Sequence, residues 1–361
     1  DDPCGGAPGL DAAGARQEGD QAGAGVGDGR GLARLLAQGA EPEGGQKGAP
    51  QHLGLEDGLS LAGELAELLL ELRQLGIAAG LGVEGPVQSP TFTLVREHRG
   101  KQFHWFEAGN PSKPRVLLVH GFMASAMAYR RVVDALAGEY HLVLPDMPAH
   151  GLDPSYRQRV VKPRLASLSA WLADFRSIFP GPIHLVGHSL GGMLCYELAK
   201  QDPAISSVTL AGPGFRVPPS ALSSYALDRL PGGIAALAAN RAGLALYGPL
   251  NWRGQPMNAD EAEAYLGPLR AADRIGFMLK VGARLMEPRA IPRLEPLVCP
   301  TLVMWGEHDH MLPIADAHWV AGALDARLEI VRAAGHSPME DCPAEFARLL
   351  LDFLSSADSA E

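Results

Sequence analysis

The strongest candidate nucleophile is Ser189, in the pentapeptide GHSLG at 187–191. This G-x-S-x-G pattern lies between an apolar stretch, IHLVG at 183–187, and a helix-forming stretch, MLCYELAKQ at 193–201. The pattern needs that context, because a tight strand-to-helix turn exposes the serine side chain and small residues let the backbone pass. A phosphate-binding loop would need a Gly-Lys-Ser/Thr sequence, which this segment lacks. The sequence therefore predicts that Ser189 is a nucleophile.

A serine hydroxyl is a weak nucleophile at neutral pH and needs an adjacent base, which a third group orients. Where such a turn carries the serine, the acid and then the base follow it along the chain. His336 meets the condition for the base, because it lies in AGHSP at 334–338, directly after the apolar stretch at 328–331. We predict that His336 accepts and returns the proton of Ser189.

Two carboxylates could orient that histidine. Asp309 and Glu307 both lie in GEHDH at 306–310, after an apolar stretch. We predict that Asp309 is the acid, since its short carboxylate lies a few residues beyond the strand, and Glu307 stays as the alternative. A metal site at His308 and His310 is the competing interpretation. An extended chain would splay these two side chains apart and no third ligand is evident, so we expect no metal.

The tetrahedral intermediate of acyl transfer needs preorganised N–H donors that face its oxyanion. One donor is predicted at Leu190, the residue after the nucleophile, and the other in the loop after the third strand, HGFM at 120–123. In that loop Phe122 is the preferred donor and Met123 is the alternative. Residues beside the donors are expected to contact substrate, namely Gly121, Met123 and His188.

Two further polar residues at strand ends are expected to support the site. His120 precedes the donor loop, and we predict that it forms structural hydrogen bonds rather than acting as a second base. Asp146 begins DMPAHG at 146–151, and we predict that its carboxylate stabilises the turn rather than taking part in the reaction.

These residues need a scaffold that brings distant loops together. The chain after residue 90 carries a β-rich hairpin, at 91–97 and 102–107, followed by six apolar runs at 116–120, 141–145, 183–187, 207–211, 301–305 and 328–331. Near-continuous apolar strands suit a parallel sheet that is covered on both faces. Helical stretches alternate with them, at about 125–138, 165–178, 190–201, 314–323 and 343–355. This alternation predicts right-handed βαβ units in a three-layer α/β domain.

One interval breaks the alternation. Between Ala211 and Thr301 lie 89 residues, although a crossover between parallel strands needs only a dozen or more. An insertion there would cover the carboxyl ends of the strands, where open α/β sheets bind ligands. We predict a helical cap at 214–288, inserted after the sixth strand, between core segments at 91–213 and 289–361.

The first 90 residues differ in composition from the rest. They hold 21 of the 43 glycines, 14 acidic and 5 basic side chains, and none of the 22 aromatic residues. Because aromatic side chains supply much of the area that a core buries, we expect the packed domain to begin after residue 90. Residues 1–58 show the composition of a disordered leader. The leucine spacing predicts one amphipathic helix at about 59–75, which would dock on the main domain or form a homodimer contact.

Composition also excludes several classes of protein. The chain has 31 basic and 41 acidic side chains, and the acidity belongs to the first 90 residues, so it offers no basic surface for nucleic acid. It has no run of about 18 apolar residues that could span a membrane. The residues DDPCGGAPGL do not resemble a signal peptide, so a cytoplasmic location is expected. The four cysteines lack the CxxC spacing of a zinc site.

Taken together, these motifs resemble those of the α/β-hydrolase superfamily. The matching pieces occur in the same order as in that superfamily and span about 91–355: HGF at 120–122, DMPAHG at 146–151, GHSLGG at 187–192, WGEHD at 305–309 and GHSP at 335–338. The resemblance implies an eight-stranded, mostly parallel sheet with a lid and hydrolysis without a cofactor. One departure is Ala149, where relatives commonly carry glycine, and it affects loop geometry rather than the three predicted catalytic residues.

The resemblance also bears on the reaction. Relatives that resemble haloalkane dehalogenases and epoxide hydrolases carry aspartate as the nucleophile, whereas Ser189 implies an acyl-enzyme and the esterase and lipase-like branch. The predicted cap is rich in apolar residues and poor in cations. We therefore predict a carboxylic ester hydrolase for apolar, short-to-medium acyl or alcohol groups. The alternatives are a hydrolase of carbon–carbon bonds in ring-cleavage products, a slow-turnover ligand receptor, and a scaffold that recruits a partner through the leader helix.

Overall fold

The computed structural model describes residues 91–216, 271–285 and 293–359. The predicted leader helix at 59–75 and most of the predicted cap lie outside these ranges.

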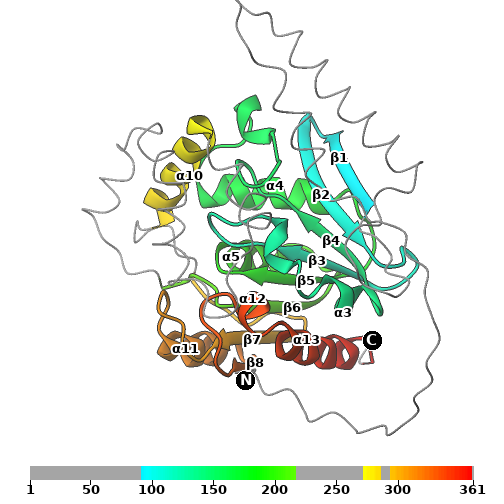
Figure 1. Cartoon of the computed structure of the whole chain (residues 1–361), viewed down its shortest axis with the longest axis vertical. Coiled ribbons are helices and arrows are strands. Elements are labelled where there is room, and N and C mark those ends of the chain that lie inside the picture. Colours follow the sequence, from blue (N-terminus) through cyan, green and yellow to red (C-terminus); the bar gives the residue numbers. More distant parts are fainter. Residues whose placement is uncertain (1–90, 217–270, 286–292, 360–361) are drawn as a thin grey trace, which may run out of the picture. The chain divides into compact units, whose positions relative to one another are not determined.

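Eight strands form one sheet (Figure 1). They are β1 (Thr91–His98), β2 (Lys101–Ala108), β3 (Arg115–Val119), β4 (His141–Pro145), β5 (Ile183–His188), β6 (Ile205–Ala211), β7 (Thr301–Gly306) and β8 (Arg327–Val331). Their order across the sheet is β1-β2-β4-β3-β5-β6-β7-β8. β2 pairs antiparallel with both β1 and β4, and the other pairings are parallel. The predicted eight-stranded, mostly parallel sheet is confirmed.

The described helices alternate with the strands as the sequence predicts. They are α3 (Val133–Ala137), α4 (Leu165–Arg176), α5 (Leu190–Ala199), α10 (Ala272–Leu285), α11 (Ile314–Leu324), α12 (Pro338–Asp341) and α13 (Pro343–Asp358). Two 3₁₀ turns also occur: η1 (Ala126–Tyr129) precedes α3, and η2 (Ser155–Gln158) precedes α4. α10 lies within the region predicted to form the cap, whereas the placement of the cap as a whole stays a prediction.

One predicted helix, at 125–138, forms two pieces, η1 and α3. The Ser125 side chain accepts a hydrogen bond from the Met127 N–H at 3.3 Å, which starts a tight 3₁₀ turn. The Tyr129 hydroxyl then donates to the Val119 carbonyl at the end of β3, at 3.0 Å. This contact holds η1 against the sheet, so the chain begins a new helix after it.

Alternate residues of the central strands face opposite sides of the sheet. Leu117 and Val119 of β3 belong to the apolar cluster that includes α4, α5 and α11. Val116 and Leu118 belong to the cluster that includes α3 and α13. Each fully buried Leu or Val side chain stabilises such a core by about 1.5–3 kcal/mol. The sheet is therefore the middle of three layers, and its position is fixed from both faces.

The six strands from β3 to β8 run in one direction, so their carboxyl ends meet at one edge of the sheet. We call the loops that directly follow these strands the carboxyl edge, and the residues that directly precede the strands the amino edge. The predicted site residues follow β3, β5, β7 and β8. The fold therefore brings together loops that are far apart in the sequence.

Candidate active site

Ser189 forms the sharp turn between β5 and α5. Its φ and ψ angles are 51° and −113°, a conformation that non-glycine residues rarely adopt. Its N–H donates to the Ala211 carbonyl at 2.9 Å, which anchors the turn to the end of β6. Ser189 is partly exposed, although His188 and Leu190 on either side are buried. The turn thus stores backbone strain in order to present one hydroxyl-bearing side chain.

The turn is possible only because small residues follow the serine. A Cβ atom on Gly191 would lie 2.2 Å from the Val119 carbonyl oxygen and 2.4 Å from that of His120. Both neighbours are backbone atoms of the β3 end, which cannot move aside cheaply. Glycine at this position lets the first turn of α5 approach the loop after β3.

His336 and Asp309 come together from the loops after β8 and β7. Nδ1 of His336 lies 2.7 Å from Oδ2 of Asp309, and their side chains are 2% and 1% exposed. A short hydrogen bond shielded from water holds the imidazole in one orientation. The Asp341 carboxylate steadies the histidine loop from behind by accepting the Gly335 N–H at 2.7 Å.

The two candidate acids have different surroundings. Oδ1 of Asp309 accepts the backbone N–H groups of Met311 and Leu312 at 2.8 and 2.9 Å, so Asp309 is fixed through both oxygens. Glu307 has a side chain that is 45% exposed, and Oε2 accepts the Ala333 N–H at 3.3 Å. Glu307 therefore joins two loops at the surface, whereas Asp309 faces His336.

His188 connects the serine turn to the histidine loop. Its Nε2 donates to the His336 carbonyl at 2.9 Å, and the two rings have centroids 4.9 Å apart. Burial, together with the charge of His336, holds the pKa of His188 well below its usual value, so the ring is neutral at neutral pH. His188 is 4% exposed, and within the described structure its buried Nδ1 has no hydrogen-bond partner.

The loop after β3 lies next to this turn. A Cβ atom on Gly121 would lie 2.7 Å from Nδ1 of His188 and 3.2 Å from Cβ of Ser189, so only glycine permits this approach. In the same loop the Met123 N–H donates to Nε2 of His150 at 3.1 Å. This bond occupies the N–H of the alternative oxyanion donor, which favours Phe122 over Met123.

His120 and Asp146 both make the structural contacts that the sequence predicts. His120 donates from Nδ1 to the Gly121 carbonyl at 2.8 Å and accepts the Met147 N–H at Nε2 at 2.9 Å. Asp146 is 1% exposed and contacts His104, the Ala126 N–H and the Leu152 N–H, each at 2.9 Å. Burial by itself would raise the pKa of Asp146, but the hydrogen bond and charge from His104 lower it. Both side chains therefore brace the carboxyl edge.

The sequence did not single out His150 or Asp341 as individual residues, although each supports the loop of a predicted site residue. His150 lies in the DMPAHG motif, so that motif was the available signal. Asp341 gave no signal, because its contact with Gly335 depends on the short helix α12, which the sequence did not predict.

An apolar wall lies beside the candidate site. Ile275 and Met278 of α10 form a buried cluster with Ala149 and Tyr156, and four partly buried side chains pack against it: Phe122, Met123, Phe277 and Leu279. The wall includes two residues of the loop after β3. Apolar groups that enter the site from this side would meet side chains that favour their burial.

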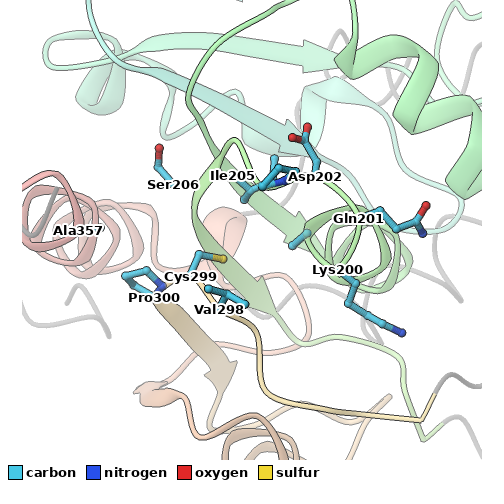
Figure 2. A pocket seen from close by; sticks show the side chains of 11 residues that line it. Lys200, Gln201, Asp202, Ile205, Ser206, Val298, Cys299, Pro300 and Ala357 are labelled. Atoms are coloured by element: carbon cyan, nitrogen blue, oxygen red, sulfur yellow. The ribbon is translucent and has the colours of Figure 1, made fainter.

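A metal ion or a second ligand would need its own cluster of side chains or its own cavity within the described ranges. In those ranges no group of three or more His, Cys, Asp or Glu side chains could hold a metal ion. A cavity of about 470 Å³ lies at the amino edge, beside the starts of β6 and β7 (Figure 2). Its lining includes Lys200, Ile205, Ser206, Cys299, Pro300 and Ala357. It lies at the opposite end of the strands from Ser189 and is not part of the candidate site.

Comparison with known families decides the classification. The sequence pattern of the alpha/beta hydrolase family matches residues 116–349. The chain belongs to the alpha/beta hydrolase family. The match spans the strands from β3 to β8 and includes Ser189, Asp309 and His336.

Named relatives place this hydrolase among ester-cleaving enzymes. It is 28% identical over 250 residues to a pimeloyl-[acyl-carrier protein] methyl ester esterase of Chromobacterium violaceum. The matched region covers 67% of this chain and 95% of the relative. It is 29% identical over 287 residues to a monoacylglycerol lipase of Xenopus laevis, covering 72% and 81% of the two chains. These relatives confirm the predicted class of carboxylic ester hydrolase.

Solved structures agree on the fold. A bacterial membrane phospholipase A superposes with a TM-score of 0.63 at 23% sequence identity, over 83% of this hydrolase and 97% of that chain. At this identity the likeness concerns the fold alone. No helix in the described part of this hydrolase is long and apolar enough to cross a membrane.

Proposed function

We propose that this hydrolase cleaves carboxylic esters with apolar, short-to-medium acyl or alcohol groups through an acyl-enzyme on Ser189. The observation that carries the proposal is the buried 2.7 Å contact between Asp309 and His336. His188 connects the loop that contains His336 to the serine turn. Acyl transfer by a serine requires a base that an acid orients, in a loop near a serine that substrate can reach.

In the proposed mechanism, Oγ of Ser189 attacks the ester carbonyl carbon while Nε2 of His336 takes the hydroxyl proton. Asp309 holds the imidazole in the correct tautomer and stabilises its charged form. The carbon–oxygen bond to the alcohol then breaks, and His336 returns the proton to the leaving alcohol. Water, activated by the same histidine, attacks the acyl-enzyme and releases the acid together with free Ser189.

Two backbone N–H groups would stabilise the tetrahedral oxyanion, those of Leu190 and Phe122. Leu190 is the first residue of α5, where N–H groups have no partner within the helix and the helix dipole favours negative charge. Phe122 is proposed because His150 engages the Met123 N–H. Each such donor contributes a factor of about 10²–10³ to turnover.

The proposed substrate class rests on the apolar wall. Phe122 and Met123 beside the serine, together with Phe277 and Leu279 of α10, offer contacts that suit an alkyl chain better than a charged group. The names of the relatives, a methyl ester esterase and a monoacylglycerol lipase, are consistent with an apolar acyl group. Gly121 and His188 border the serine turn, and contact of either with substrate stays a prediction.

The test is hydrolysis of a series of p-nitrophenyl esters of increasing acyl length by the purified 361-residue chain. The wild type should hydrolyse short and medium esters, and Ser189→Ala should lose about 10⁶-fold in kcat, the loss typical of a removed nucleophile. Circular dichroism should show that the variant stays folded. Retention of a tenth of the wild-type rate by pure Ser189→Ala would refute the proposed nucleophile. A stoichiometric burst without turnover would instead support the receptor alternative.

A further inference from the structure

Two histidine rings hold the peptide planes on either side of Phe122. The carbonyl of Gly121, in the plane before Phe122, accepts a hydrogen bond from Nδ1 of His120 at 2.8 Å. The N–H of Met123, in the plane after it, donates to Nε2 of His150 at 3.1 Å. In a trans peptide the N–H points away from the carbonyl, so the first bond fixes the direction of the Phe122 N–H. The second bond fixes the rotation of the chain that follows.

The hydrogen bonds at the far side of each ring determine which nitrogen carries the proton. Nδ1 of His150 lies 3.0 Å from the Pro148 carbonyl, so Nδ1 donates and Nε2 is left as the acceptor. His120 is arranged in the same way, because its Nε2 accepts the Met147 N–H. Both rings thus join the loop after β3 to the turn after β4.

The acceptor role of His150 requires a neutral ring, and its surroundings keep it neutral. The side chain is 0% exposed. Burial lowers the pKa of His150 to about 3, and the neighbouring His120 ring acts in the same direction, against smaller opposing effects of Pro148 and Asp146. The ring therefore accepts the Met123 N–H across the whole neutral range.

The bond to Met123 also holds a strained backbone. Met123 has a φ angle of 57°, in the left-handed region that non-glycine residues rarely enter. Such strain costs about 1–3 kcal/mol and persists only where the surroundings enforce it. His150 supplies that constraint at the residue next to Phe122.

The turn that carries His150 is itself held by α10. The Arg274 guanidinium donates to the carbonyls of His150 and Gly151, at 3.3 and 2.6 Å. Ile275 and Met278 of α10 pack against Ala149 in the same turn. A continuous series of contacts therefore runs from α10 through His150 to the loop that carries Phe122.

We infer that His150 is a positioning residue that sets the oxyanion donor at Phe122, and that Arg274 couples the docking of α10 to this donor. The inference rests on the proposed function, because it assigns Phe122 to the oxyanion of acyl transfer. Its consequence is that an apolar group seated against α10 would stabilise the geometry of the transition state, not only bind substrate.

The experiment compares four variants of the 361-residue chain: His150→Leu, His150→Gln, Arg274→Met and, as a matched control, His184→Leu. His184 is an equally buried histidine at the start of the same strand, β5, that ends at the serine turn. Three quantities are measured: kcat, KM for a p-nitrophenyl ester, and the affinity for an alkyl boronic acid, which forms a tetrahedral anionic adduct with a serine.

His150→Leu should lower kcat about 10²-fold and weaken boronic acid binding by a similar factor, with KM changed less than about threefold. His150→Gln should recover at least about tenfold of the loss, because its side-chain oxygen can accept the Met123 N–H. Arg274→Met should lower kcat about fivefold, and its effect should nearly vanish in the His150→Leu background, since both act through one series of contacts. His184→Leu should keep the wild-type kcat.

Wild-type kcat and boronic acid affinity in a folded His150→Leu variant would overturn the inference, as would an equal loss in His184→Leu. Should His150→Leu fail to fold, His150→Gln and Arg274→Met test the inference in its place, because a positioning role predicts that kcat falls while KM changes little.

¹⁵N NMR of the His150 ring in the wild type gives a readout without turnover. It should show Nδ1 protonated and Nε2 unprotonated at pH 6, and a protonated Nε2 would overturn the inference while leaving the proposed function standing. Failure of the proposed function is distinct, because the wild type would then hydrolyse no ester.

Discussion

The two ends of β5 carry buried histidines with opposite surroundings. At the amino edge, His184 contacts the Ser207 hydroxyl through Nδ1 and the Asp358 carboxylate through Nε2, each at 2.9 Å. At the carboxyl edge, His188 bonds one backbone carbonyl, and its other nitrogen is unpartnered in the described structure. Both ring nitrogens of His184 therefore have polar partners, whereas only one ring nitrogen of His188 has a partner in the described structure.

Backbone strain follows the same division. Seven described non-glycine residues have positive φ angles. Four of them lie in the loops after β3, β4, β5 and β8, namely Met123, Ala149, Ser189 and Ala333, while Arg99 lies in the hairpin between β1 and β2 and Arg159 ends η2. At the amino edge Asp325 also has a positive φ, but as the left-handed residue that ends α11, a position that aspartate tolerates. Within the described residues, strained backbone is thus concentrated at the carboxyl edge, where the chemistry is proposed.

The largest effect on activity that tests this comparison of the two edges is expected from substitution of Asp309. Asp309→Asn keeps the shape of the side chain but should leave His336 in the wrong tautomer, and a similar change in a serine protease lowers kcat about 10⁴-fold. Glu307→Gln is the matched control in the same loop and should change kcat less than about threefold, because Glu307 braces the surface. Steady-state kinetics at matched folding stability measures both. The reverse ranking would move the acid to Glu307.

The next effect concerns the pH dependence of stability and arises at Asp153. This carboxyl is 0% exposed, and within the described ranges its Oδ2 has no partner. Burial raises its pKa to about 8, and the Asp146 charge adds to this effect, against smaller opposing hydrogen bonds from Ser155. Since the folded pKa exceeds the unfolded value of 3.8, the folded protein holds a proton that the unfolded chain releases. The unfolding free energy should therefore fall as pH rises from about 4 to 8.

Asp153→Asn should remove this loss, which amounts to about 6 kcal/mol above pH 8. Urea unfolding at pH 5 and pH 9 measures it, with the wild type losing stability between the two values and the variant losing much less. If the unfolding free energies of the two proteins changed equally with pH, Asp153 would be ionised in the folded state. The carboxyl edge would then lack this destabilised buried group.

A smaller difference in stability is expected between substitutions at two helical glycines, one in the first turn of α5 and one within α11. Gly191→Ala would place a Cβ against two backbone carbonyls at the carboxyl edge and should destabilise the protein by about 1–3 kcal/mol. Gly322→Ala in α11, where no described atom outside the helix's own backbone lies within 4 Å of the added Cβ, should stabilise it by about 0.5–1 kcal/mol. Thermal unfolding of both variants checks the pair. Similar shifts in the same direction would contradict the close approach of α5 to β3.

The sequence predicted the strands well, because buried parallel strands are near-continuous apolar runs. It also predicted which loops meet, since the predicted acid, base and nucleophile all follow strands that run in one direction. It identified Ala149 as unusual for the family, and the structure gives that residue a φ angle of 68°, a conformation that glycine adopts without strain.

Other features could not be read from the sequence because they depend on distant contacts. Helix 125–138 divides where Tyr129 bonds the end of β3, a contact without any local pattern. The acceptor role of His150 depends on where the Met123 N–H points, and the choice between Asp309 and Glu307 depends on which side chain the fold buries. Periodicity reports which face of an element is apolar, but not which polar atoms meet at its end.

The most direct test is mass spectrometry of the 361-residue chain, quenched with acid milliseconds after mixing with p-nitrophenyl acetate. The wild type should gain the mass of one acetyl group, located by digestion on the peptide that contains Ser189. Asp309→Asn should acquire the same adduct much more slowly, and Ser189→Ala should acquire none. An acetyl group on any other residue, or ester hydrolysis by Ser189→Ala at the wild-type rate, would contradict the central claim that the carboxyl edge is strained in order to expose a nucleophilic serine.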